Sequence, residues 1–152
     1  MIAVAFVFAS LVLAGLLVGS MFAVCLIFNP ARIDASTYVS RQQWGIRTLH
    51  PALPLLGMIT ALSIIVASIL SRSDRTRASL LLIAAALFIV AGLITRLRNQ
   101  PINKIVTTWS PQAPPADWSR LRDAWWRGHT LRFGAGLVGL SLLILAALHQ
   151  PV

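Results

Sequence analysis

The sequence predicts an all-α fold: a four-helix transmembrane bundle with an extended, partly helical loop before the fourth span. Hydrophobic residues make up 57% of the 152 residues and charged residues only 11%, whereas soluble domains carry about 25% charged residues. The apolar residues fall into four runs, and a helix that crosses a bilayer needs about 20 such residues. We therefore expect one integral membrane domain over residues 1–152.

The first apolar run covers residues 2–28 and ends at an Asn-Pro pair, which stops a helix. It is longer than the apolar core of a signal peptide, about 7 to 15 residues, so we expect a retained first span. Gly15, Gly19 and Ala23 recur at every fourth position within it. This small-residue stripe predicts close packing on another helix of the same chain, with a homo-oligomer as the alternative.

The remaining spans follow from the same pattern. The second run, 51–71, begins at a proline, and a short polar turn separates it from the third run, 78–95. The fourth run covers 131–148. Four spans place both termini on one side of the membrane and the connections 29–50 and 96–130 on the other.

Positive charge is distributed unequally between the two sides. The side with the long connections carries ten cationic residues: Arg32, Arg41, Arg47, Arg96, Arg98, Lys104, Arg120, Arg122, Arg127 and Arg132. The side with the termini carries only Arg72, Arg75 and Arg77. The positive-inside rule therefore predicts that the long connections are cytoplasmic and that both termini lie outside.

Composition also excludes several kinds of site. The chain has no Glu, so a carboxylate-bridged di-iron site is excluded. The net charge of +9 is expected to serve topology and contact with lipid headgroups, and we expect no nucleic-acid partner. The single cysteine, Cys25, excludes an internal disulfide and a thiolate zinc cluster, and its apolar surroundings indicate a packing residue.

Connection 96–130 is long for a helical bundle, and long loops are usually functional. After three prolines, five of its residues are spaced 4, 3, 4 and 3 apart and so share one helix face that runs into the fourth span: Trp118, Arg122, Trp125, His129 and Arg132. Arg132 is always charged, so inside the bundle it needs an anion, an amide oxygen or a ligand oxygen, and otherwise its side chain reaches the headgroups. A neutral His129 can act as a base near pH 7, or can be a hydrogen-bonded interfacial histidine.

Two further features mark this side of the membrane. Arg98, Asn99, Asn103 and Lys104 surround Pro101, which is expected to turn the chain beyond the third span, where the alternative is an ordinary capped helix end. All five tryptophans also lie here: Trp44, Trp109, Trp118, Trp125 and Trp126. They form either a headgroup belt or the wall of a cavity for a flat aromatic ligand.

Three short motifs stand out in this connection: N-x-P-I-N (Asn99, Pro101, Asn103), D-W (Asp117, Trp118) and W-x-x-x-H-x-x-R (Trp125, His129, Arg132). Together they resemble the anthrone oxygenase family of four-span membrane proteins, many of whose members carry Asn in place of His129. The resemblance implies an oxygenase of polyketide biosynthesis that converts an anthrone to a quinone with O2 and needs no organic cofactor or metal. It also suggests a bacterial cytoplasmic membrane.

The implied chemistry removes a proton from the anthrone and holds the resulting enolate oxygen. We expect His129 to act as the base, Arg132, Asn99 and Asn103 to hold oxygens, and tryptophans to form walls. The expected site residues are His129, Arg132, Asn99 and Asn103 for catalysis, with Trp118, Trp125, Arg98 and Trp109 for binding a hydrophobic aromatic substrate.

Two alternatives stay open. A membrane redox protein would use His50 and His129 as haem or metal ligands. A non-catalytic accessory membrane subunit would use the Asn-Pro-Asn segment only as a structural cap.

Overall fold

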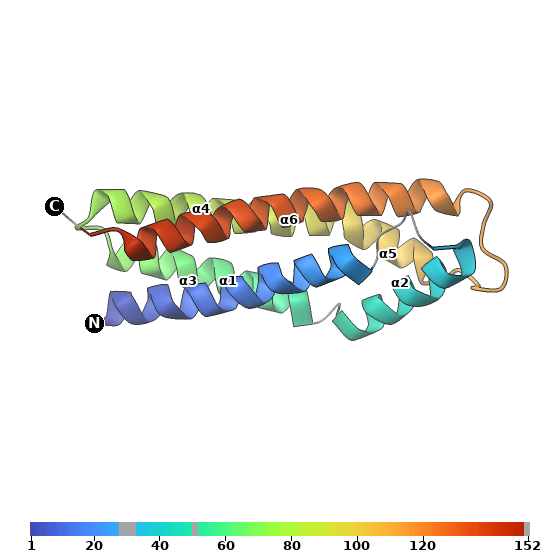
Figure 1. The fold of residues 1–152 in the computed structure, drawn as a ribbon, viewed down its shortest axis with the longest axis horizontal. Coiled ribbons are helices and arrows are strands. Elements are labelled where there is room, and N and C mark those ends of the chain that lie inside the picture. Colours follow the sequence, from blue (N-terminus) through green and yellow to red (C-terminus); the bar gives the residue numbers. More distant parts are fainter. Residues whose placement is uncertain (28–32, 50–51, 151–152) are drawn as a thin grey trace.

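A computed structural model describes residues 1–27, 33–49 and 52–150 of the chain (Figure 1). Four helical stretches are long and apolar enough to cross a membrane: α1 (Ile2–Ile27), α3 (Ala52–Leu70), the stretch Arg75–Val106, and α6 (Trp118–Leu148). They run alternately in opposite directions along one long bundle, and the described residues form no strand. The all-α four-span prediction is confirmed.

The third span is longer than predicted and contains no turn at Pro101. A π-helical turn, η2 (Thr95–Asn99), joins α4 (Arg75–Ile94) to α5 (Gln100–Val106) without a break. Pro101 lies in the first turn of α5, where a missing N–H is tolerated. The helix therefore continues through the segment that the sequence pattern assigned to a loop, and the non-helical part of 96–130 shrinks to residues 107–117.

Connection 29–50 also contains a helix that the hydrophobic pattern did not predict. Helix α2 (Ala35–Leu49) begins after Asp34, whose carboxylate accepts hydrogen bonds from the Thr37 hydroxyl and backbone N–H. These bonds lower the pKa of Asp34. Two of its five buried residues are Gln42 and Gln43, so the face toward the protein is mixed and lacks the continuous apolar stripe of a typical amphipathic helix. The Gln43 amide donates to the carbonyls of Val106 and Trp109 and fastens α2 to the end of α5.

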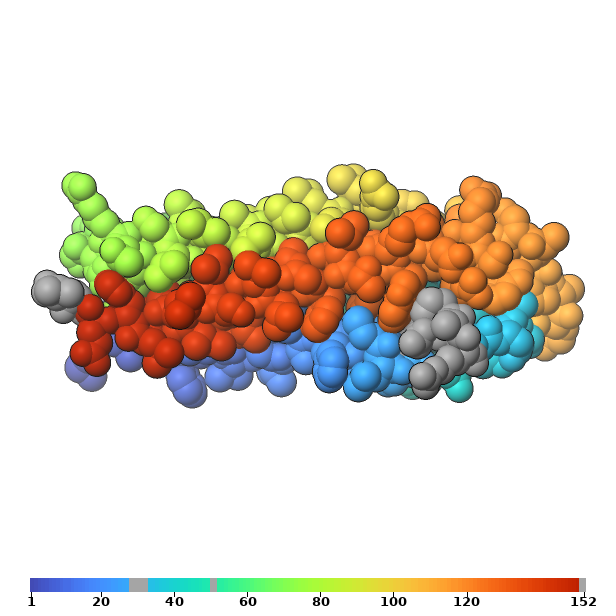
Figure 2. All heavy atoms as spheres, turned by 45° about the horizontal axis from the view of Figure 1, so that its top comes forward, coloured from blue at the N-terminus to red at the C-terminus, as the bar shows by residue number. Residues whose placement is uncertain are grey.

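In the bundle core, the long helices approach one another closely at small residues. At Gly139 of α6, an added Cβ would lie 3.1 Å from Cε2 of Phe88 in α4, so glycine lets these two helices approach closely. Between α1 and α3, the hydroxyls of Ser10 and Ser63 are 2.8 Å apart in a buried hydrogen bond. Figure 2 shows α6 along the whole length of one face, between α4 and α1.

The small-residue stripe of α1 does not pack inside the chain, so that prediction is wrong. An added Cβ at Gly15 or Gly19 would meet nothing within 4 Å, and Ala23 is exposed. The inward face carries different residues: Ala14, Leu17, Val18, Met21 and Val24. The larger apolar side chains bury more surface than the glycines would, and they determine which face is inside.

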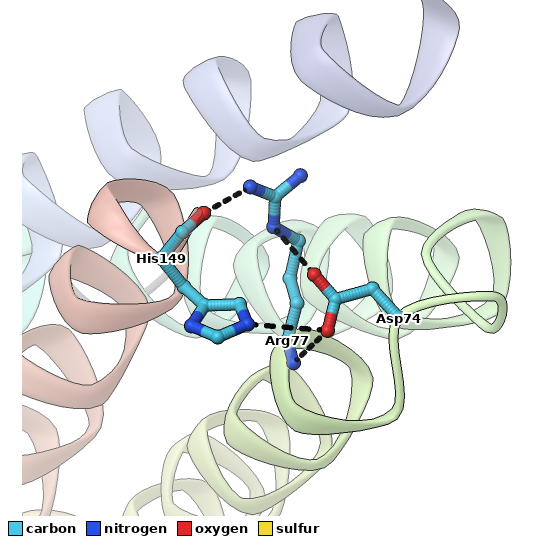
Figure 3. Close-up of polar contacts among 3 residues, drawn as sticks. All are labelled: Asp74, Arg77 and His149. Carbon is cyan, nitrogen blue, oxygen red and sulfur yellow. Dashed lines mark hydrogen bonds and ion pairs between the residues drawn. The ribbon is translucent and has the colours of Figure 1, made fainter. Parts of the chain in front are cut away.

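A polar cluster closes the end of the bundle where the chain begins and α6 ends (Figures 1 and 3). Asp74 caps α4 by accepting the backbone N–H of Arg77, and its carboxylate lies 3.3 Å from Nε2 of His149. The Arg77 guanidinium donates to the backbone carbonyl of His149. The turn between α3 and α4 is thereby tied to the end of α6.

Candidate functional site

A cavity of about 460 Å³ lies among α1, α2, α3, α4 and α6. This volume is in the range of sites for small organic ligands, and most of its wall is apolar, as such sites usually are. The polar side chains on the wall gather toward the α2 and α5 end of the bundle: Gln42, Thr95, Arg96, Gln100, Asn103 and Arg132. The cavity thus has an apolar body and one polar end.

Arg132 contributes a guanidinium group to the cavity wall. Its Nε and Nη2 lie 3.1 and 2.8 Å from Nδ1 of His129, and its Nη1 donates to the Thr95 hydroxyl at 3.1 Å. Within the ranges that the structure describes, no Asp carboxylate pairs with this guanidinium. Since a guanidinium has five N–H donors, some remain for a ligand.

His129 is fully buried behind Arg132 and is not part of the cavity wall. Its Nε2 lies 3.0 Å from the carbonyl oxygen of Met21 and 3.3 Å from Sγ of Cys25. Because a carbonyl can only accept, Nε2 carries the proton and Nδ1 is the acceptor for Arg132. The ring stacks on Trp125, with centroids 5.3 Å apart and an interplanar angle of 3°. His129 therefore fixes the position of Arg132.

The two asparagines of the N-x-P-I-N motif have different positions. Asn103 lies on the cavity wall, and its Oδ1 accepts from Nε2 of Gln42 at 3.1 Å and from Nε1 of Trp125 at 2.8 Å. Its Nδ2 is thereby oriented as a donor for a ligand. Asn99 is buried off the cavity wall, where its Nδ2 donates to the backbone carbonyl of Trp125. It packs directly on Gly128, where an added Cβ would lie 2.8 Å from Oδ1 of Asn99.

Three residues expected to bind substrate lie away from the cavity. Trp118 packs on Tyr38, with ring centroids 5.7 Å apart, and under the Arg122 guanidinium. Burial raises the pKa of Tyr38 far above its ordinary value. Trp109 belongs to the same hydrophobic cluster, and Arg98 is exposed. Trp125 is the predicted aromatic wall residue that does line the cavity.

Sequence reasoning missed several cavity residues. Gln42 lies on the unpredicted helix α2, Thr95 is the first residue of the π-helical turn, and Gln100 directly follows that turn. Gly57 and Gly92 also line the cavity. A polar residue inside an amphipathic stretch gives no distinctive signal by itself, so only the register of the helices reveals these side chains.

The alternative haem or metal site stays a prediction, because one of its two expected ligands is not among the described residues. Both ring nitrogens of His129 bond to groups of the protein, and His50 lies outside the described residues. In the part of the chain that the structure describes, no three His, Cys, Asp or Glu side chains cluster in a way that could hold a metal ion.

Part of the chain is similar to a known protein family. A family model described as "Anthrone oxygenase" matches residues 42–142. The chain belongs to the anthrone oxygenase family. The part that matches the anthrone oxygenase model begins at Gln42 and ends within α6, so it contains all the polar residues of the cavity end. No curated protein and no solved structure matches the chain.

Proposed function

We propose that this protein is a membrane oxygenase that oxidises an electron-rich polycyclic phenol or anthrone to a quinone with O2 as co-substrate. The observation that carries the proposal is Arg132, a guanidinium held by His129 and Thr95 at the wall of a mostly apolar cavity. A cation in such surroundings strongly attracts a developing oxyanion. Membership of the anthrone oxygenase family supports the same class of reaction.

The cavity suggests how the substrate is held. The flat apolar rings lie in the apolar body, against Trp125 and Phe88, and the oxygens face the polar end. Arg132 and the Nδ2 group of Asn103 donate to these oxygens, while Gln42 and Trp125 hold the Asn103 side chain in its donor orientation. The same donors stabilise the enolate oxygen when the anthrone loses a proton.

The reaction balances without a further redox partner. The anthrone methylene releases one proton, and the enolate transfers an electron to O2. The resulting radical pair forms a carbon–oxygen bond, and the peroxide takes up a proton. The hydroperoxide then loses water by cleavage of its O–O bond, so CH2 and O2 become a carbonyl group and one water molecule. We propose that these reaction steps need no cofactor.

The proposed role of His129 differs from that of a general base. Its nitrogens bond to Met21 and Arg132, and the described cavity wall contains no carboxylate or histidine. We therefore propose that Arg132 makes the bound anthrone more acidic and that the proton leaves to water near Arg96 and Gln100, at the polar end. His129 is a positioning residue in this mechanism.

The orientation of the protein in the membrane is part of the proposal. Arg132 serves the cavity, yet the excess of cationic residues on the α2 and α5 side persists without it. We place that side in the cytoplasm of a bacterial cell and the termini outside. The reaction would then take place near the cytoplasmic surface of the bilayer.

Oxygen uptake with emodin anthrone tests the proposed activity. Arg132→Ala should lower kcat/KM by about 10² to 10³, the usual effect of removing an oxyanion donor. Arg127→Ala is the matched control, because Arg127 lies on the same helix, is exposed, and is not on the cavity wall. Its activity should equal that of the wild type.

Two results would contradict the proposal. Wild-type oxygen uptake by a folded Arg132→Ala protein would remove Arg132 from the chemistry. A Soret band in the absorption spectrum of the purified protein that disappears in His129→Ala would favour the haem alternative. If the wild type does not accelerate oxygen uptake with any anthrone, the protein is better described as an accessory membrane subunit.

A further inference from the structure

The cavity has an open side within the apolar part of the bundle. Four of the residues on its wall are also exposed on the outer surface: Met58 and Leu62 on α3, and Ile89 and Gly92 on α4. All four lie inside helices that are long and apolar enough to cross a membrane. The surface at this opening therefore faces lipid hydrocarbon.

The helices α3 and α4 are in contact near the turn that joins them and both border the cavity farther along. Near the turn that joins them, the Ser68 hydroxyl donates to the carbonyl of Ala78. Farther along, residues of both helices line the cavity, from Ile65 and Phe88 to Leu53 and Gly92. We call the opening between Met58 and Leu62 on α3 and Ile89 and Gly92 on α4 the slit.

Gly92 keeps this slit free of side chains. A Cβ added at Gly92 would meet no atom within 4 Å, although the residue lines the cavity. No close helix contact therefore explains a glycine here, in contrast to Gly139, where Phe88 is in the way. A side chain at position 92 would extend into open space at the mouth of the cavity.

We propose that the ligand of the cavity enters sideways from the bilayer through the slit between α3 and α4. The ligand class, a flat polycyclic molecule with oxygens along one edge, rests on the function proposed above. Such a molecule dissolves in hydrocarbon and would pass Met58 and Leu62 with its polar edge leading toward Arg132. The concentration that determines binding is then the mole fraction of ligand in the lipid.

The Gly92→Leu variant in lipid nanodiscs tests this route. The probes are anthracene, which has no oxygens, and emodin, a hydroxyanthraquinone. Binding is followed by quenching of tryptophan fluorescence, since Trp125 lines the cavity. Gly92→Leu should slow association of both probes by about tenfold or more. Gly15→Leu is the matched control, because its side chain also meets open space but lies away from the cavity, and it should bind like the wild type.

The outcomes separate this inference from the proposed activity. Equal association rates for Gly92→Leu and the wild type would overturn the lateral route, as would rates that depend on the aqueous concentration of probe at fixed mole fraction in the lipid. Absence of binding of both probes to the wild type would also overturn it. If both probes bind through the slit but no anthrone is oxidised, the route stands and the proposed oxygenase activity fails.

Discussion

At the scale of single residues, His129 and Arg132 form a pair in which only the arginine reaches the cavity. The W-x-x-x-H-x-x-R spacing predicted that both would share a helix face, because residues three and four apart are neighbours on a helix. It did not predict which of them would face the ligand. That depends on Met21 of α1, whose carbonyl holds the far side of the imidazole.

Replacement of His129 distinguishes the positioning role from that of a base. His129→Asn keeps an acceptor for Arg132 and should retain kcat/KM within about tenfold, whereas His129→Phe removes the acceptor and should lose about 10² to 10³. The double variant His129→Phe/Arg132→Ala should be no slower than Arg132→Ala, because both changes remove the same interaction. A loss of 10² to 10⁴ in His129→Asn would instead indicate a general base.

Gly128 should tolerate no side chain while Asn99 is present. Gly128→Ala would place a Cβ 2.8 Å from Oδ1 of Asn99, in a fully packed contact between η2 and α6. We expect a loss of about 1 to 3 kcal/mol in the free energy of unfolding, as for other overpacked sites. Thermal unfolding in detergent measures it, with Gly134→Ala as the control, since its Cβ would meet nothing within 4 Å. Equal stability of the two variants would contradict the packing described for Asn99.

At the scale of elements, α2 is held by apolar burial and by hydrogen bonds together. Tyr38 and Val39 pack against Val106 of α5, and the Gln43 amide donates to backbone carbonyls at the end of α5. Patterns of hydropathy predicted the four spans well, since each span is uniformly apolar, but missed α2. The π-helical turn was also missed, because a proline inside a helical pattern usually ends the helix. Here the wider turn before Pro101 allows the helix to continue.

Loss of the Gln43 side chain should weaken the docking of α2 on the bundle. Gln43→Ala leaves the carbonyls of Val106 and Trp109 without this donor, which should destabilise the docked position by about 1 to 3 kcal/mol. Amide hydrogen exchange should become faster in α2 and stay unchanged in α1. Gln112→Ala is the control, because Gln112 is exposed and bonds only to Ser110 in the described structure. Unchanged exchange in α2 would show that other contacts hold it.

At the scale of the whole molecule, the bundle is longer than a bilayer is thick. The 31 residues of α6 extend about 46 Å, against about 30 Å for the hydrocarbon core. Arg132 lies about 24 Å along this helix from Leu148. With Leu148 at one edge of the hydrocarbon core, the polar end of the cavity would lie near the other edge. The apolar runs predicted the four spans. They did not predict how deep in the membrane the cavity lies, because that depends on how far the helices extend beyond the apolar runs.

The cluster of Asp74, Arg77 and His149 at the opposite end of the bundle should make the thermal stability of the protein depend on pH. Hydrogen bonding from the Arg77 backbone N–H, and then the nearby charges of His149 and Arg77, lower the pKa of Asp74 below its ordinary value of 3.8. A carboxylate of this kind stabilises the fold above its unfolded pKa, and the contribution is lost as the pH falls through the lower folded pKa.

Thermal unfolding of Asp74→Asn across pH tests this dependence. The variant keeps an acceptor for the cap but has no charge, so it should unfold at a lower temperature than the wild type at pH 7. The difference should shrink below about pH 4. Asp123→Asn is the control, because its half-exposed carboxylate lies at the other end of the bundle. A difference that stays constant from pH 7 to pH 3 would show that the charge of Asp74 does not matter.

The contact between Asn99 and Gly128 limits how this protein can change over evolutionary time. Any residue larger than glycine at 128 would collide with the amide at 99, so position 128 cannot accept a larger residue while Asn99 is unchanged. Among related chains, an alanine or serine at position 128 should therefore occur together with a smaller residue at position 99. The two positions should stand out as a covarying pair, although they belong to different helices and lie far apart in sequence.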